Sequence, residues 1–89
     1  MNGAFLDSRS LAKLRWRCRR GMLENDLFIE RFFERYEHEI TPQRSTALGM
    51  LMDLSDNDLL DLLLCRKEPE GDIDRPDVRD VLAMLRQRP

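Results

Sequence analysis

The sequence predicts an all-α fold, a compact single-domain bundle of five short helices spanning residues 1–89. Apolar residues recur every three or four positions along the chain, and no stretch alternates apolar and polar residues as a half-buried strand would. Capping residues and prolines separate these stretches at the places where short helices would begin. A chain of 89 residues, of which 42% are hydrophobic, has room for one modest core.

The first helix is expected to begin at Asp7 or Ser8, because either side chain can accept a hydrogen bond from an otherwise unpaired amide of the first turn. Its apolar positions form a narrow stripe: Leu11, Leu14, Cys18 and Met22. The basic residues of the helix fall on another face. Gly21 suits the left-handed conformation that often ends a helix, since it has no Cβ to clash there. Residues 1–6 are expected to form a flexible N-terminus.

The second helix is expected to run from about Leu23 to Glu39 and to supply the broadest apolar face. That face is predicted to be the spine of the core and to consist of Leu23, Leu27, Phe28, Phe32, Phe33, Tyr36 and Ile40. Thr41 and Pro42 then predict an N-cap and a first-turn proline, where the missing N–H of proline costs nothing. The third helix should face the core with Leu48, Leu51 and Met52.

Ser55 is expected to cap a fourth helix, whose first turn carries acids that complement the helix dipole. The buried side of this helix is predicted to consist of Leu59, Leu60, Leu63 and Leu64. Residues 66–74 combine proline, glycine and acids, and they are expected to form an acidic loop. Asp74 is predicted to cap the fifth helix, with Pro76 in the opening turn. The apolar residues of that helix recur at helical spacing: Val78, Val81, Leu82 and Leu85.

Charge is distributed unevenly along this acidic chain, whose formal net charge is -2. From Arg9 to Arg20 there are six basic residues and no acid, whereas acids dominate between Glu68 and Asp80. Because the overall balance is acidic, we expect no general polyanion binding and no nucleic-acid partner. A basic patch on one short helix suits an acidic protein at least as well. A small nucleic-acid-associated regulator that uses this helix, with Trp16 stacking on a base, is the alternative hypothesis.

The sequence offers little from which to build an active site or a metal centre. His38 is the single histidine and is expected to be a solvated surface residue, which leaves no paired-histidine catalysis or His-based metal site. No glycine-rich phosphate loop occurs. Cys18 and Cys65 are both expected to be buried structural thiols, and the arginines beside Cys18 leave a redox sensor as a third hypothesis. We therefore expect no catalytic residue, no metal and no enzyme activity.

The sequence RGMLEND, residues 20–26, follows directly on the basic stretch. One interpretation is a helix junction, in which Gly21 ends one helix while Glu24 and Asp26 complement the dipole of the next. The other interpretation is an exposed docking corner, where arginine, bare backbone and carboxylates provide donors and acceptors within one small patch. The residue pattern alone favours neither interpretation.

The chain resembles the SdhE family of succinate dehydrogenase assembly factors over roughly residues 11–64. The family signature, Arg-Gly-x-x-Glu-x-Asp, is met by Arg20, Gly21, Glu24 and Asp26. The flanking residues also fit the family pattern: Trp16-Arg17-Cys18-Arg19-Arg20 before the signature, Phe32-Phe33-Glu34 and Tyr36 after it, and Asp58-Leu59 at the start of a leucine-rich helix. Members are small five-helix bundles, as the periodicity of this chain independently predicts.

The resemblance implies a chaperone that promotes covalent attachment of FAD to the flavoprotein subunit of succinate dehydrogenase and, in some bacteria, of fumarate reductase. The factor would hold that subunit so that one of the subunit's own histidines attacks the isoalloxazine methyl group. FAD therefore belongs to the partner, and no cofactor is expected on this chain. The implied partner-binding residues are Arg20, Gly21, Glu24 and Asp26. Flanking contacts are expected from Lys13, Trp16 and Arg17, whereas Phe32, Phe33 and Tyr36 are expected in the core.

The compartment is also predicted from the sequence. The sequence shows no signal peptide and no apolar run long enough to span a membrane. The N-terminus has no Arg- and Ser-rich leader, which favours a bacterial cytoplasm over a mitochondrial matrix.

Overall fold

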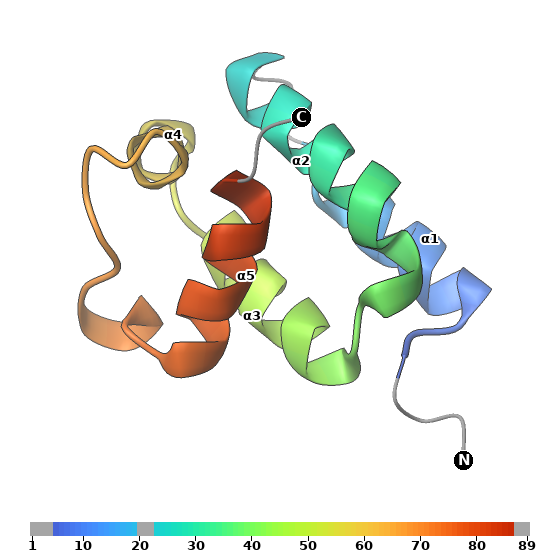
Figure 1. The fold of residues 1–89 in the computed structure, drawn as a ribbon. Coiled ribbons are helices and arrows are strands. Elements are labelled where there is room, and N and C mark those ends of the chain that lie inside the picture. Colours follow the sequence, from blue (N-terminus) through green and yellow to red (C-terminus); the bar gives the residue numbers. More distant parts are fainter. Residues whose placement is uncertain (1–4, 20–22, 87–89) are drawn as a thin grey trace.

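The computed structural model describes residues 5–19 and 23–86, and within these residues it is an all-α bundle (Figure 1). The five helices are α1 (Ser8–Arg17), α2 (Leu23–Tyr36), α3 (Pro42–Met52), α4 (Asp56–Leu63) and α5 (Pro76–Arg86). Two short 3₁₀ helices are η1 (Glu37–Glu39) and η2 (Gly71–Ile73). The predicted fold class and the number of helices are therefore confirmed.

Helix α5 is the centre of the packing, because it contacts α2, α3 and α4. Figure 1 shows α1 beside α2, on the side of the bundle away from α4. The core contains buried residues from all five helices, among them Leu14, Phe32, Leu48, Leu59 and Leu82. Burial of each such side chain contributes roughly 1.5–3 kcal/mol, so packing around α5 is the main source of stability.

Three helix starts follow the sequence prediction. The side chains of Asp7, Thr41 and Ser55 each accept a hydrogen bond from the amide three residues later, at 2.8, 3.1 and 3.2 Å. Each bond satisfies one of the first-turn amides that have no partner within the helix. The predicted N-caps of α1, α3 and α4 are therefore confirmed.

The start of α5 differs from the prediction that Asp74 caps it. Asp74 lies two residues before Pro76, and its carboxylate accepts a hydrogen bond from Arg79 Nε at 2.8 Å. Instead, Asp77 Oδ1 accepts a hydrogen bond from the Val78 amide at 2.9 Å, inside the first turn of the helix. The Asp74 carboxylate is thus used to hold the loop against α5 rather than to cap it.

The predicted apolar face of α2 needs a correction at its beginning. Leu23 is 70% exposed and Leu27 is 45% exposed, although both were expected in the core. The buried positions of the first turns are instead Asn25 and Ile29, which lie four residues apart and continue to Phe32 and Phe33. The buried stripe is therefore rotated about the helix axis from the predicted face, and it contains a polar residue.

The helix ends also differ from the prediction. Helix α1 ends at Arg17 with Cys18 as its C-cap, before the expected junction at Gly21. Gly21, together with Arg20 and Met22, lies outside the described residues. Helix α2 ends at Tyr36, and its predicted last turn is the 3₁₀ helix η1.

Replacing Thr41 with alanine is expected to lower the free energy of unfolding by about 1 kcal/mol, because the Arg44 amide loses its hydrogen-bond acceptor. Thr41→Ser keeps the hydroxyl and serves as the matched control, with a stability close to that of the wild type. Urea denaturation followed by circular dichroism measures both variants. Equal stability of Thr41→Ala and the wild type would contradict the assigned cap.

The Asp7 cap is expected to weaken in acid. Hydrogen bonding from Ser10, first from its amide and then from its hydroxyl, holds the pKa of the Asp7 carboxyl below its usual value. The bond therefore stabilises the fold above the unfolded pKa of about 3.9, and this contribution is lost as the pH falls through the lowered folded pKa. An NMR titration should find an Asp7 midpoint below that of the same residue in a short peptide. Identical midpoints would contradict the cap.

Candidate partner-binding site

The signature falls in the segment from the end of α1 to the first turn of α2, residues 18–26, which we call the α1–α2 corner; the structure describes residues 18, 19 and 23–26 of it. Glu24 and Asp26 belong to the first turn of α2. The Glu24 side chain is exposed, and Asp26 is half-buried. Arg20 and Gly21 fall outside the described residues, so the structure places the carboxylate half of the signature. That half is accessible from solvent, as a docking surface requires.

A groove of about 390 Å³ runs between α1 and α2 and reaches the α1–α2 corner. The residues that line it are Ala12, Arg15, Trp16, Arg19, Asp26, Ile29, Glu30, Phe33 and Glu34. One wall is therefore cationic and aromatic, and the other wall is acidic. Ile29 and Phe33, which are almost completely buried, form an apolar floor. Such a groove suits a protein segment that presents an apolar side chain between charges of both signs.

Trp16 is the most conspicuous residue of the groove. Trp16 is 78% exposed, more than Phe5, Leu23 or Leu27, the other exposed large hydrophobic residues in the described part of the chain. A tryptophan that leaves solvent on binding contributes a large apolar area, and tryptophan is enriched among the residues that dominate binding energies. Trp16 is therefore well placed to anchor a partner.

Arg15 fixes the position of α1 against α2. Its Nη1 donates to Glu37 Oε2 at 2.8 Å, and its Cζ lies 5.3 Å from the centroid of the Phe33 ring. The pair is partly exposed, so its Coulomb energy is modest, but both contacts restrain the same guanidinium. The cationic wall of the groove is consequently held in place by contacts within the fold.

The three residues predicted as flanking contacts have different environments in the structure. Trp16 lines the groove, and Lys13 is exposed on α1 without lining it. Arg17 points elsewhere: its Nη2 lies 3.7 Å from Asp53 Oδ1, and its guanidinium lies against Gly49 of α3. Arg17 therefore contacts the bundle, while its side chain is 58% exposed and its expected contact with the partner stays a prediction.

Sequence reasoning identified Asp26 but missed Glu30 and Glu34 of the acidic wall, and it missed the floor of the groove. Asp26, Glu30 and Glu34 recur every four residues, which places them on one face of α2. Ile29 and Phe33 show the same spacing one position earlier in each turn. This spacing could have predicted an acidic face beside an apolar one on α2. Phe33, however, was predicted only as a core residue, and Ile29 was not part of the predicted apolar face.

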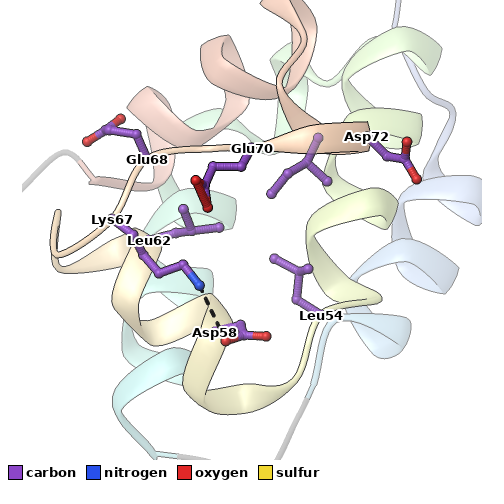
Figure 2. Close-up of a pocket in the computed structure, with 8 residues that line it drawn as sticks. Leu54, Asp58, Leu62, Lys67, Glu68, Glu70 and Asp72 are labelled. Carbon is purple, nitrogen blue, oxygen red and sulfur yellow. Dashed lines mark ion pairs between the residues drawn. The ribbon is translucent and has the colours of Figure 1, made fainter.

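A second cavity, of about 240 Å³, lies on the α4 side of the bundle, and none of the predicted site residues that the structure describes lines it (Figure 2). Figure 2 shows Leu54 and Leu62 pointing into it, with Lys67 and Asp58 joined by an ion pair of 3.5 Å. Glu68 at its rim lies 3.3 Å from Arg86 Nη2 and 3.9 Å from Arg79 Nη1. These pairs attach the acidic segment to α5, which gives that charge a structural role.

In the folded chain, acidic residues from other elements lie beside the basic residues of α1. Glu37 pairs with Arg15, and Asp53 lies beside Arg17. The two carboxylates reduce the positive potential that the linear sequence suggests, which weakens the nucleic-acid alternative.

Among residues 5–19 and 23–86, no group of three or more His, Cys, Asp or Glu side chains could hold a metal ion. In the same part of the chain, no helix is both long and apolar enough to cross a membrane.

The two cysteines have different environments. Cys18 is completely buried, as predicted. Cys65 is exposed, so the prediction of a second buried thiol is wrong. The physical reason is that α4 ends at Leu63 and Cys65 follows in a left-handed conformation with φ 62°, where the helical register no longer applies.

Comparison with known proteins adds an independent line of evidence. A family model, Sdh5, described as flavinator of succinate dehydrogenase, matches residues 12–89. An FAD assembly factor SdhE of Ralstonia nicotianae is 59% identical over 80 residues, which cover 90% of this chain and 84% of the relative. Proteins of the same name from Coxiella burnetii and Legionella pneumophila are 42% and 34% identical, covering 66% and 76% of this chain and 72% and 86% of the relatives. The search of solved structures found no match.

The two thiols are expected to react at different rates with a water-soluble disulfide reagent. Cys65 should react quickly because it is exposed, and Cys18 should react only when the bundle opens. Cys65→Ser would leave one slow thiol, and Cys18→Ser would leave one fast thiol. Equal rates in the two single-cysteine variants would contradict the observed burial.

Proposed function

Because this chain belongs to the family of succinate dehydrogenase flavinators, we propose that it binds the flavoprotein subunit of succinate dehydrogenase and promotes the covalent attachment of FAD to it. The observation that carries this proposal is the match to the flavinator family along residues 12–89. The exposed groove that reaches the α1–α2 corner supports it, because it gives such a factor a surface for its client.

The proposed contacts with the client combine the signature and the groove. The exposed Glu24 accepts a charged hydrogen bond from the client, and Trp16 inserts an apolar anchor. From the family resemblance we assign Gly21 a close backbone approach. The full proposed set consists of Lys13, Trp16, Arg20, Gly21, Glu24 and Asp26.

The proposed mechanism is binding rather than catalysis by this chain. A binder shifts a conformational equilibrium of its client only by the difference between its affinities for the two conformations. A tenfold shift needs about 1.4 kcal/mol, and one hydrogen bond to a charged group contributes about 1.5–3 kcal/mol. A few contacts made only with the assembly-competent conformation are therefore sufficient. The reacting histidine and FAD both belong to the client, so this chain acts as a non-enzymatic factor.

The range of clients and the compartment complete the proposal. We include the flavoprotein subunit of fumarate reductase as a second client, because the family resemblance implies this client in some bacteria. The matched relatives are bacterial proteins, and we place the function in a bacterial cytoplasm. Binding assays with each purified flavoprotein subunit test the client range directly.

Glu24→Ala is expected to weaken the complex with the flavoprotein subunit by roughly 10- to 100-fold, since a charged hydrogen bond is lost. Covalent FAD in the subunit should fall in parallel. Isothermal titration calorimetry measures the affinity, and flavin fluorescence of the denatured subunit in a gel measures the covalent product. Glu39→Ala removes an exposed carboxylate of η1 and is the matched control. Normal binding and normal covalent FAD with Glu24→Ala would contradict the proposal.

Trp16→Ala is expected to weaken the same complex while leaving the fold intact, because the side chain is 78% exposed in the free protein. Loss of a central aromatic anchor typically costs about 2 kcal/mol or more of binding free energy. The tryptophan fluorescence of the wild type should also change when the client is added. An unchanged affinity together with unchanged fluorescence would place the client elsewhere on the bundle.

A further inference from the structure

Asn25 links the α1–α2 corner to the beginning of α4. It lies in the first turn of α2, between the signature residues Glu24 and Asp26, and is completely buried. Its Nδ2 donates a hydrogen bond to the backbone oxygen of Asp56, the first residue of α4, at 3.0 Å. A buried amide group that loses such a partner is costly, so this bond holds the first turn of α2 in one position.

Arg17 links the other side of the corner to the end of α3. It is the last residue of α1, and its guanidinium lies against the backbone of Gly49. A Cβ at position 49 would lie 3.1 Å from Arg17 Nη1, closer than an ordinary van der Waals contact, and 3.4 Å from Nη2, at the limit of one. The glycine therefore creates the space that the guanidinium occupies. Arg17 Nη2 also lies 3.7 Å from Asp53 Oδ1, directly after α3.

The two links reach the same short turn. Residues 53–55 connect α3 to α4, with Asp53 as the C-cap of α3 and Ser55 as the N-cap of α4. Arg17 approaches this turn from the end of α1, and Asn25 approaches it from the start of α2. The end of α1 and the start of α2 are thus each linked to the α3–α4 turn by a side chain.

From this geometry we infer that the α3–α4 turn positions the groove between α1 and α2, with Arg17 and Asn25 as positioning residues. The inference rests on the proposed function. The relative placement of α1 and α2 sets the distance between the two walls of the groove, and binding sites lose affinity when their supporting contacts are loosened. The ion pair of Arg17 with Asp53 is largely exposed and contributes little free energy, so the restraint on Arg17 comes from the packing of its guanidinium against Gly49.

Gly49→Ala tests the Arg17 link and separates positioning from stability. The added methyl group displaces the guanidinium, which is free to move because the side chain of Arg17 is 58% exposed. Alanine is the better helix former, so the melting temperature should be equal or higher. Client affinity should nevertheless fall about tenfold, as expected for a loosened site. Ser45→Ala, one turn earlier in α3, is the control and should keep the wild-type affinity.

Asn25→Leu tests the second link with a side chain of similar size that cannot donate a hydrogen bond. Asn57→Leu makes the same substitution at an exposed position of α4 and is the matched control. Both variants are measured at a temperature at which circular dichroism shows them fully folded. Asn25→Leu should weaken client binding, and Asn57→Leu should not. Wild-type client affinity in both Gly49→Ala and Asn25→Leu would overturn the inference.

A readout without client keeps this inference separate from the proposed function. Amide hydrogen exchange at Leu27 and Phe28 reports the opening of the first turns of α2. Exchange there should be faster in Asn25→Leu than in the wild type. In Gly49→Ala, exchange should be faster at Cys18, whose amide donates to the Leu14 carbonyl at the end of α1. Exchange in α5 should be unchanged in both variants. If the wild-type chain does not bind the flavoprotein subunit, the proposed function fails, and exchange alone decides the inference. Unchanged exchange at these amides in both variants would then overturn it.

Discussion

Burial of Asn25 is the constraint from which the geometry of the binding surface follows. A buried amide needs a hydrogen-bond partner, and the Asp56 carbonyl provides one only when the first turn of α2 lies on the start of α4. Successive residues of an α-helix are rotated by about 100°, so an inward Asn25 turns its neighbour Glu24 outward. The exposure of the signature carboxylate is therefore a consequence of how its neighbour is buried.

Helix α2 faces the core on one side and the groove, our proposed client site, on the other. Phe32 and Ile29 pack inward, while the carboxylates at positions 26, 30 and 34 line the groove opposite the cationic wall of α1. Arg15 holds that wall in place through Glu37 and the Phe33 ring. A small bundle can in this way present a preorganised surface, which reduces the entropy lost on binding. A factor that favours one conformation of its client, and whose client carries out the covalent reaction itself, needs such a surface.

Local features of the fold could be predicted from the sequence, and long-range ones could not. The cap at Thr41 was predictable because the hydrogen bond spans three residues. The exposure of Leu27 was not, because periodicity shows an apolar face without showing which part of it meets the core. Asn25 is polar, and only its bond to Asp56, 31 residues away, explains its burial. Cys65 was misplaced because α4 ends before it and the chain turns to positive φ.

The most direct test of the account is the footprint of the client on this chain, measured by amide hydrogen exchange of the isotopically labelled protein with and without the flavoprotein subunit. Slower exchange should appear along α1, the α1–α2 corner and the groove side of α2, with little change from residue 66 to residue 75. Protection of the segment beside the smaller cavity (Figure 2), with α1 and the α1–α2 corner unchanged, would contradict the placement of the client in the groove.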